Sequence, residues 1–172
     1  ELAWNPGDLN QLLIGTNSAL EVWDFDTQIS TIPMQYRNSS RVAYNPDGSQ
    51  FAVTDWNEIQ VWDSASLTLS SILSAHTEGI EVLFWIEAGL VSATHGEGQT
   101  MYLWESNSNL PRQLTHNGHI TTAISPDAST YIVGTDNGKM VFATNTGCLV
   151  DTLYYSQETQ DDINQPCNET DD

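Results

Sequence analysis

Residues 41–73 read RVAYNPDGSQFAVTDWNEIQVWDSASLTLSSIL, and this stretch decides the fold class. The turn Asn45-Pro46-Asp47-Gly48 separates two apolar runs, because proline presets its φ and glycine accepts a positive φ. Further along, apolar and polar residues alternate, which is the period of a β-strand. The stretch therefore predicts four short antiparallel strands, at residues 41–44, 50–54, 59–62 and 67–73.

The pattern recurs along the chain at intervals of about 40 residues. Apolar or aromatic residues form one column, which contains Trp4, Tyr44, Phe84 and Ile124. A second marker occurs further along each unit, as Val22-Trp23-Asp24, Val61-Trp62-Asp63, Leu103-Trp104-Glu105 and, more weakly, Val141-Phe142-Ala143. Agreement over four units is specific evidence for an internal repeat. A unit this small buries both faces of its sheet only by stacking against its neighbours.

The interval, the Trp-Asp endings and the Asn-Pro-Asp-Gly turn resemble the WD-repeat family of β-propellers. The resemblance covers residues 1–155 and implies four blades, at about 1–36, 37–76, 77–116 and 117–155. We expect an all-β chain with almost no helix, in which each blade has four antiparallel strands. The resemblance also implies that the first strand of each blade lies nearest a central channel.

The chain departs from the family pattern in a hydrogen-bond network. In WD repeats a His before the first strand is held by an Asp in the loop between the second and third strands and by the Trp of the third strand. His76, His116, Asp136 and the aromatic residues Trp23, Trp62 and Trp104 match these structural positions. Because each blade lacks at least one member, we expect an incomplete network in every blade.

Blade number is the second departure. Four blades of a seven-bladed ring would sweep only about 206°. Three arrangements stay open: part of a longer propeller with further blades upstream, a ring completed by a second chain, or a ring of four. In the first two, open strand edges are covered by the added blades.

The charge balance disfavours several classes of ligand. The chain has 23 acidic side chains against four basic ones, a net charge of −19. Nucleic acids and anionic membrane surfaces are bound through Lys and Arg, so we expect neither as a partner, and no apolar run is long enough to insert into a membrane. The acidic, lysine-poor surface slightly favours an extracellular or cell-surface location over the cytoplasm.

Residues 156–172 predict a disordered acidic tail, because the repeat stops and acidic residues occur without basic ones. It is either a frayed end or a docking tag for a basic partner. Cys148 and Cys167 either form a disulfide that ties the tail to the last blade, or are unrelated thiols.

The sequence contains no recognisable catalytic set. No Gly-x-Ser-x-Gly elbow and no glycine-rich phosphate loop occurs, and the histidines lack the spacing of a metal site. We therefore expect neither an enzyme nor a bound cofactor or metal.

The loops that meet on one face of such a propeller are the expected binding surface for a protein or peptide. They carry Tyr36, Arg37, Arg41, Asp55, Trp56, His95, Glu97 and His119. Trp56 stands where the other blades have small polar residues, and Trp and Arg are enriched at binding hot spots. Trp56 either anchors a partner, with Arg37 and Arg41 nearby, or folds back onto its own blade.

These observations predict a non-catalytic interaction scaffold or sensor surface. The alternative is the C-terminal WD-repeat sensor region of a larger protein with an upstream kinase or NTPase domain. An enzyme within the propeller is a third candidate, which the missing catalytic set disfavours.

Overall fold

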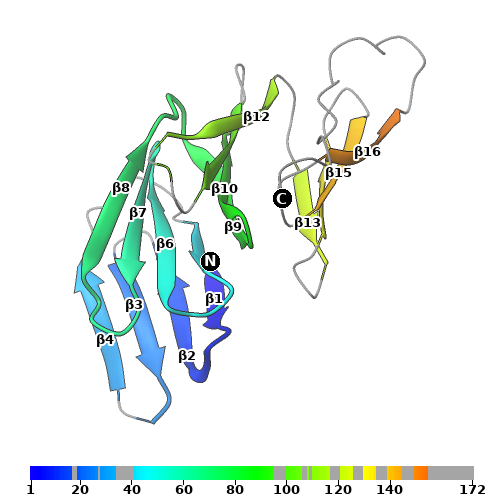
Figure 1. The fold of residues 1–172 in the computed structure, drawn as a ribbon. Coiled ribbons are helices and arrows are strands. Elements are labelled where there is room, and N and C mark those ends of the chain that lie inside the picture. The colour runs from blue at the N-terminus through cyan, green and yellow to red at the C-terminus, as the bar shows by residue number, and fades with distance from the viewer. Residues whose placement is uncertain are drawn as a thin grey trace.

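The computed structural model contains only β-structure in the residues it describes, without a helix (Figure 1). The described residues are 1–16, 19–26, 28–33, 41–94, 100–105, 108, 110–116, 121–125, 130–134, 139–144 and 149–154. They form four antiparallel sheets, each of four strands that pair in chain order. The prediction of an all-β chain is confirmed for these residues, and the tail at 156–172 lies outside them.

Each sheet corresponds to one sequence repeat. Sheet A comprises β1 (Leu2–Asn5), β2 (Asp8–Gly15), β3 (Ala19–Asp24) and β4 (Gln28–Pro33). Sheet B comprises β5 (Val42–Tyr44), β6 (Gln50–Asp55), β7 (Glu58–Asp63) and β8 (Leu69–Ser74). Sheet C comprises β9 (Ile80–Ile86), β10 (Gly89–Thr94), β11 (Thr100–Glu105) and β12 (Arg112–His116). Sheet D comprises β13 (Thr121–Ile124), β14 (Thr130–Gly134), β15 (Lys139–Thr144) and β16 (Leu149–Tyr154).

The pairing registers give the aromatic residues of the third strands one shared position. Trp23, Trp62, Trp104 and Phe142 pair with Leu12, Phe51, Leu90 and Ile132, respectively. These four second-strand residues in turn pair with Trp4, Tyr44, Trp85 and Ala123 of the first strands. The four sheets therefore share one register, and equivalent residues can be compared among them.

The first-strand column read from the sequence is wrong in sheets C and D. The register places Trp85 and Ala123 in the column of Trp4 and Tyr44, where the 40-residue interval had placed Phe84 and Ile124. Adjacent residues of a strand point to opposite faces, so the error exchanges the faces of both strands. In sheet C its cause is hairpin length, because residues 45–49 separate β5 from β6 whereas only residues 87–88 separate β9 from β10. Residues 125–129 separate β13 from β14, so hairpin length does not explain the difference in sheet D.

Sheets A, B and C pack face to face in chain order. One buried cluster joins sheet A to sheet B, and it contains Leu13, Leu20, Val22, Val42, Tyr44, Phe51 and Val53. A second joins sheet B to sheet C, and it contains Ala52, Ile59, Val61, Ile80, Leu83, Leu90 and Trp104. The first strands β1, β5 and β9 also contact one another in that order. Burial follows the strand period, since Ile59 and Val61 are buried while their neighbours in β7 are partly exposed.

A polar seam adds to the apolar contact between sheets A and B. The Asn5 side-chain amide donates to the Gly48 carbonyl and the Ser64 hydroxyl of sheet B, at 3.2 and 3.3 Å. The Gln11 amide oxygen accepts from the hydroxyls of Tyr44 and Ser64, at 3.0 and 3.1 Å. Burial raises the pKa of Tyr44 to about 12, so its hydroxyl keeps its proton across the physiological range. Such pairing offsets the cost of burying these groups.

Gly48→Ala is expected to lower the free energy of unfolding by about 2 kcal/mol. Gly48 has a φ of 74°, and a Cβ there would collide with Oδ1 of Asn5 and lie 2.7 Å from the backbone nitrogen of Gly7. Urea unfolding measures the loss. Gly7 is not a suitable control because its own Cβ would meet the Asp47 carbonyl. Ala65→Gly in the exposed β7–β8 turn tests instead whether any Ala/Gly exchange in a turn has this effect, and a Gly48→Ala loss no larger than that of the control would contradict the account.

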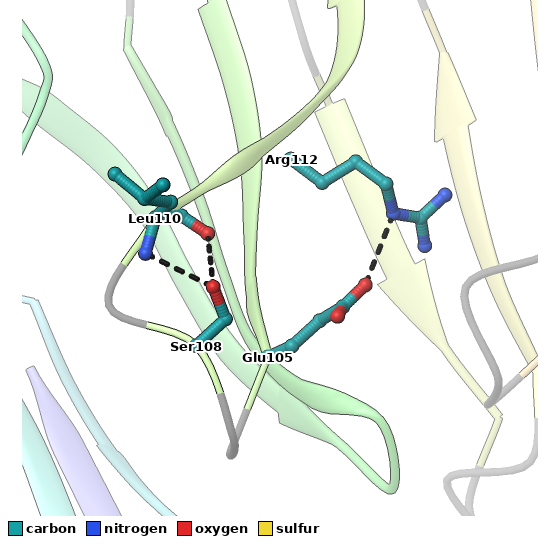
Figure 2. A network of polar contacts seen from close by, with 4 residues as sticks. All are labelled: Glu105, Ser108, Leu110 and Arg112. Carbon is teal, nitrogen blue, oxygen red and sulfur yellow. Dashed lines mark hydrogen bonds and ion pairs between the residues drawn. The ribbon is translucent and has the colours of Figure 1, made fainter.

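An exposed polar cluster closes the turn between β11 and β12 (Figure 2). Glu105 and Arg112 form an ion pair at 3.3 Å, with about half of each side chain exposed. The Ser108 hydroxyl accepts from the Leu110 amide and donates to the Leu110 carbonyl, both at 3.1 Å. Exposed ion pairs contribute less than about 1 kcal/mol, so this cluster shapes the turn more than it stabilises the sheet.

Candidate partner-binding surface

Trp56 is one of two residues in the tight turn between β6 and β7. Its φ is 58°, a region that bulky side chains rarely occupy, and its side chain is 46% exposed. A positive φ at the first central position of a two-residue hairpin turn is normally provided by glycine. The chain therefore has a large, exposed aromatic residue at a backbone conformation that disfavours bulky side chains.

The Trp56 ring lies against the connection between β8 and β9. A Cβ built on Gly79 would lie 3.2 Å from Cζ3 and 3.3 Å from Cε3 of the indole. The ring thus contacts a segment outside its own hairpin, and the two sequence interpretations of Trp56 both stay open. It covers Gly79, in the segment leading to sheet C, and leaves nearly half of its surface open.

Hydrogen bonds fix this turn to the same connection. The Ile80 amide donates to the Trp56 carbonyl at 2.8 Å, and the Asn57 side-chain amide donates to the His76 carbonyl at 2.9 Å. The indole thus sits on backbone held at two points, which reduces the ordering cost of any contact it makes.

Arg41 lies at the same end of sheet B. Its backbone amide donates to the Thr54 hydroxyl at 2.8 Å, next to the turn, and its Nε donates to the Glu81 carbonyl of sheet C at 2.6 Å. Arg41 therefore links sheets B and C and is also a candidate contact for a partner. Its terminal guanidinium nitrogens are not committed by these two bonds.

Three acidic residues lie in or next to the segments that form the Trp56 turn. Asp55 and Glu58 are opposite each other in the strand register of the hairpin, and both are partly exposed. Glu78 precedes Gly79 and is exposed. Among the described residues, the Trp56 turn thus combines an open indole with three carboxylates and the clamped Arg41.

Several predicted site residues fall outside the described part of the chain. These are Tyr36, Arg37, His95, Glu97, His119, Asp136, Cys148 and Cys167. His116 ends β12, but its side chain is likewise not described. Of the predicted binding residues, the structure therefore brings together Asp55, Trp56 and Arg41.

His76 is the centre of a buried network in sheet C. Its Nε2 lies 2.7 Å from the Ser92 hydroxyl, which also accepts a hydrogen bond of 2.8 Å from the Trp104 indole. Its Nδ1 lies 3.0 Å from the Thr100 hydroxyl. The ring is 3% exposed, and burial lowers the pKa of His76 to about 4. His76 is therefore neutral at pH 7 and orders the segment on which Trp56 rests.

Sequence reasoning missed Ser92 and Thr100. The sequence lacks the family's loop Asp in this repeat, and in sheet C the Thr100 hydroxyl contacts Nδ1 of His76. In sheets A and B, the Trp23 and Trp62 indoles instead donate to Glu21 and Gln60 of their own strands. The signal for Ser92 was a hydroxyl between the apolar residues Val91 and Ala93 of β10, since a buried Trp needs an acceptor.

No protein-family model matches the chain, and no curated protein matches it. No helix long and apolar enough to cross a membrane occurs in the described residues. The same residues contain no group of three His, Cys, Asp or Glu side chains placed to hold a metal ion.

Trp56→Gly is expected to leave the free energy of unfolding within about 1 kcal/mol of wild type, because relief of the positive φ offsets the lost ring contact. Chemical denaturation followed by circular dichroism measures it. The control is Trp104→Gly, which removes a buried indole (3% exposed) and should destabilise strongly. A loss above about 2 kcal/mol for Trp56→Gly would make the indole a structural residue.

Proposed function

We propose that the chain is a non-catalytic protein-interaction module built of WD-like propeller blades, with its binding surface at the Trp56 turn. The observation that carries the proposal is Trp56 itself, nearly half exposed at a φ of 58°. Bulky residues rarely adopt this φ, and residues with such strained backbone conformations concentrate at functional positions.

The blade arrangement is supported by the shared register of the four sheets. Trp23, Trp62, Trp104 and Phe142 hold the same place in their sheets. Sheets A, B and C pack in chain order, and their first strands are neighbours, as strands beside a central channel would be. We propose that further blades or a second chain complete the ring.

The local chemistry favours a peptide or protein as the occupant. The open indole provides apolar area at low entropic cost, and Asp55, Glu58 and Glu78 provide polar contacts at its rim. The Ile80 and Asn57 hydrogen bonds hold the backbone beneath the indole, so binding costs little conformational entropy there.

Selection from a random peptide library displayed on phage tests this function. We expect enriched peptides to bind wild type and to lose at least about 30-fold in affinity for Trp56→Gly, the loss typical of a hot spot. Phe25→Ala is the matched control, because it removes an exposed aromatic residue of sheet A and should leave the affinity unchanged. Failure to enrich any peptide, or peptides that bind both variants equally, would refute the proposal.

A further inference from the structure

Among sheets A, B and C, only sheet B opposes two carboxylates at the turn between its second and third strands. Asp55 and Glu58 are partners at the last step of the β6–β7 register, one on each side of the Trp56 turn. Residues placed in this way have Cβ atoms about 5 Å apart, and like charges there destabilise a hairpin. Neither carboxylate forms an ion pair within the part of the chain that the structure describes. The hairpin thus carries a repulsion that no described ion pair offsets.

The equivalent turns of sheets A and C manage without charge. Continuing the registers that pair each third-strand Trp, the positions of Asp55 and Glu58 are taken by Thr16 and Ala19 in sheet A and by Thr94 and Thr100 in sheet C. The Thr16 amide donates to the Ala19 carbonyl at 3.0 Å, and the Thr100 amide donates to the Thr94 hydroxyl at 3.1 Å. The fold therefore does not require an acidic pair here, and the pair coincides with the exposed Trp56.

A third carboxylate lies next to the segment that the indole contacts. Glu78 is exposed and directly precedes Gly79, against which the Trp56 ring packs. The ring itself is 46% exposed. The described basic residue at this end of sheet B is Arg41, whose Nε donates to the Glu81 carbonyl at 2.6 Å. An open aromatic ring and three acidic residues therefore occur together at one turn.

We infer that the partner presents a lysine or arginine side chain to the Trp56 turn, with its cation against the indole and its charge balanced by Asp55, Glu58 and Glu78. The inference rests on the proposed function and names the chemistry of the partner. Indole is the aromatic ring that attracts cations most strongly, and the carboxylates add ion pairs. An apolar or acidic side chain would cover the same ring but would leave the opposed carboxylates unpaired.

The charge of the whole chain favours the same class of partner. The chain has 23 acidic residues against four basic ones, a net charge of −19. Such a charge raises the rate at which cationic peptides encounter the chain and disfavours acidic ones. The Trp56 turn would then provide the specific contact for a peptide that the overall charge attracts.

Synthetic peptides from the phage selection described above test the inference. We expect each enriched peptide to contain a lysine or arginine whose replacement by glutamine lowers its affinity for wild type at least about 10-fold. Glutamine keeps a polar side chain of similar length without the charge. The affinity of the unmodified peptide should also fall as the salt concentration rises, because salt screens exposed charges.

The variant Asp55→Asn/Glu58→Gln removes the opposed charges and keeps the shapes of the side chains. It should weaken the basic peptide at least about 10-fold and change the affinity of the glutamine-substituted peptide far less. Urea unfolding should show it to be at least as stable as wild type, because a like-charge pair is lost, so misfolding would not explain weaker binding. The control Asp8→Asn/Asp26→Asn removes two exposed carboxylates of sheet A and should leave the affinity unchanged.

The outcomes separate this inference from the proposed function. Peptides that require Trp56 but bind equally well after their basic residues are replaced would overturn the inference and leave the binding surface in place. Equal effects of the two double variants would also overturn it, because only the net charge would then matter. Peptides that bind independently of Trp56 would refute the binding surface and this inference with it.

Discussion

Phe51→Ala is expected to lower the free energy of unfolding by about 4 kcal/mol, the largest effect predicted for a single substitution. Phe51 is fully buried in the cluster between sheets A and B. Its ring stacks on Trp62 at 6.3 Å and meets Tyr44 edge to face at 5.7 Å. Truncation removes both ring contacts and leaves a cavity in the cluster between sheets A and B.

Urea unfolding followed by tryptophan fluorescence measures the loss. Leu110→Ala is the control, because Leu110 is 80% exposed and its truncation should change stability by less than about 0.5 kcal/mol. Phe51→Leu should fall between the two, since it keeps most of the apolar volume. Equal effects of Phe51→Ala and Leu110→Ala would mean that sheets A and B do not share this core.

The second large effect is acid destabilisation through His76. The pKa of His76 is lowered from 6.5 to about 4 by burial, so the unfolded state takes up the proton first as the pH falls. The contribution of neutral His76 is fully present above pH 6.5, is lost as the pH falls from 6.5 towards 4, and falls no further below 4. The shift corresponds to about 3 kcal/mol.

His76→Gln isolates this contribution, because glutamine keeps polar atoms but does not titrate. Between pH 7.5 and pH 4, wild type should lose about 3 kcal/mol more than the variant in urea unfolding, while carboxylates shared by both cancel. Parallel pH profiles would show that His76 is not buried as a neutral ring.

The strands were predictable where the sequence alternates cleanly. In the second repeat the four expected strands agree with β5 to β8 to within two residues, because apolar side chains alternate between the buried faces. The third-strand aromatics were also aligned correctly, since a Trp before Asp or Glu marks one register position.

The alignment of the first strands failed for a physical reason. A hairpin loop can gain or lose a residue without breaking the hydrogen bonds between its two strands, so a constant repeat interval does not determine strand register. In sheet C, the two-residue turn at 87–88 displaced the column by one residue. One residue is sufficient to exchange Phe84 and Trp85 between faces.

The candidate site was half predictable. Trp56 was recognised because a bulky aromatic residue occupied a turn that favours small polar ones. Its contact with Gly79 and the Ile80 hydrogen bond join segments from different repeats, and the Asn57 hydrogen bond joins residues 19 apart, so no local pattern encodes them. Thr100 was missed because it lies in the repeat after that of His76. Its hydroxyl also makes a contact that the family pattern assigns to a carboxylate.

Hydrogen exchange of the chain with and without a peptide selected for binding tests the central claim most directly. The account predicts slowed amide exchange at residues 55–58 and 76–81, the two segments joined beneath the Trp56 indole, and no such change in Trp56→Gly. Protection confined to other segments, or equal protection in the variant, would contradict a binding surface at the Trp56 turn.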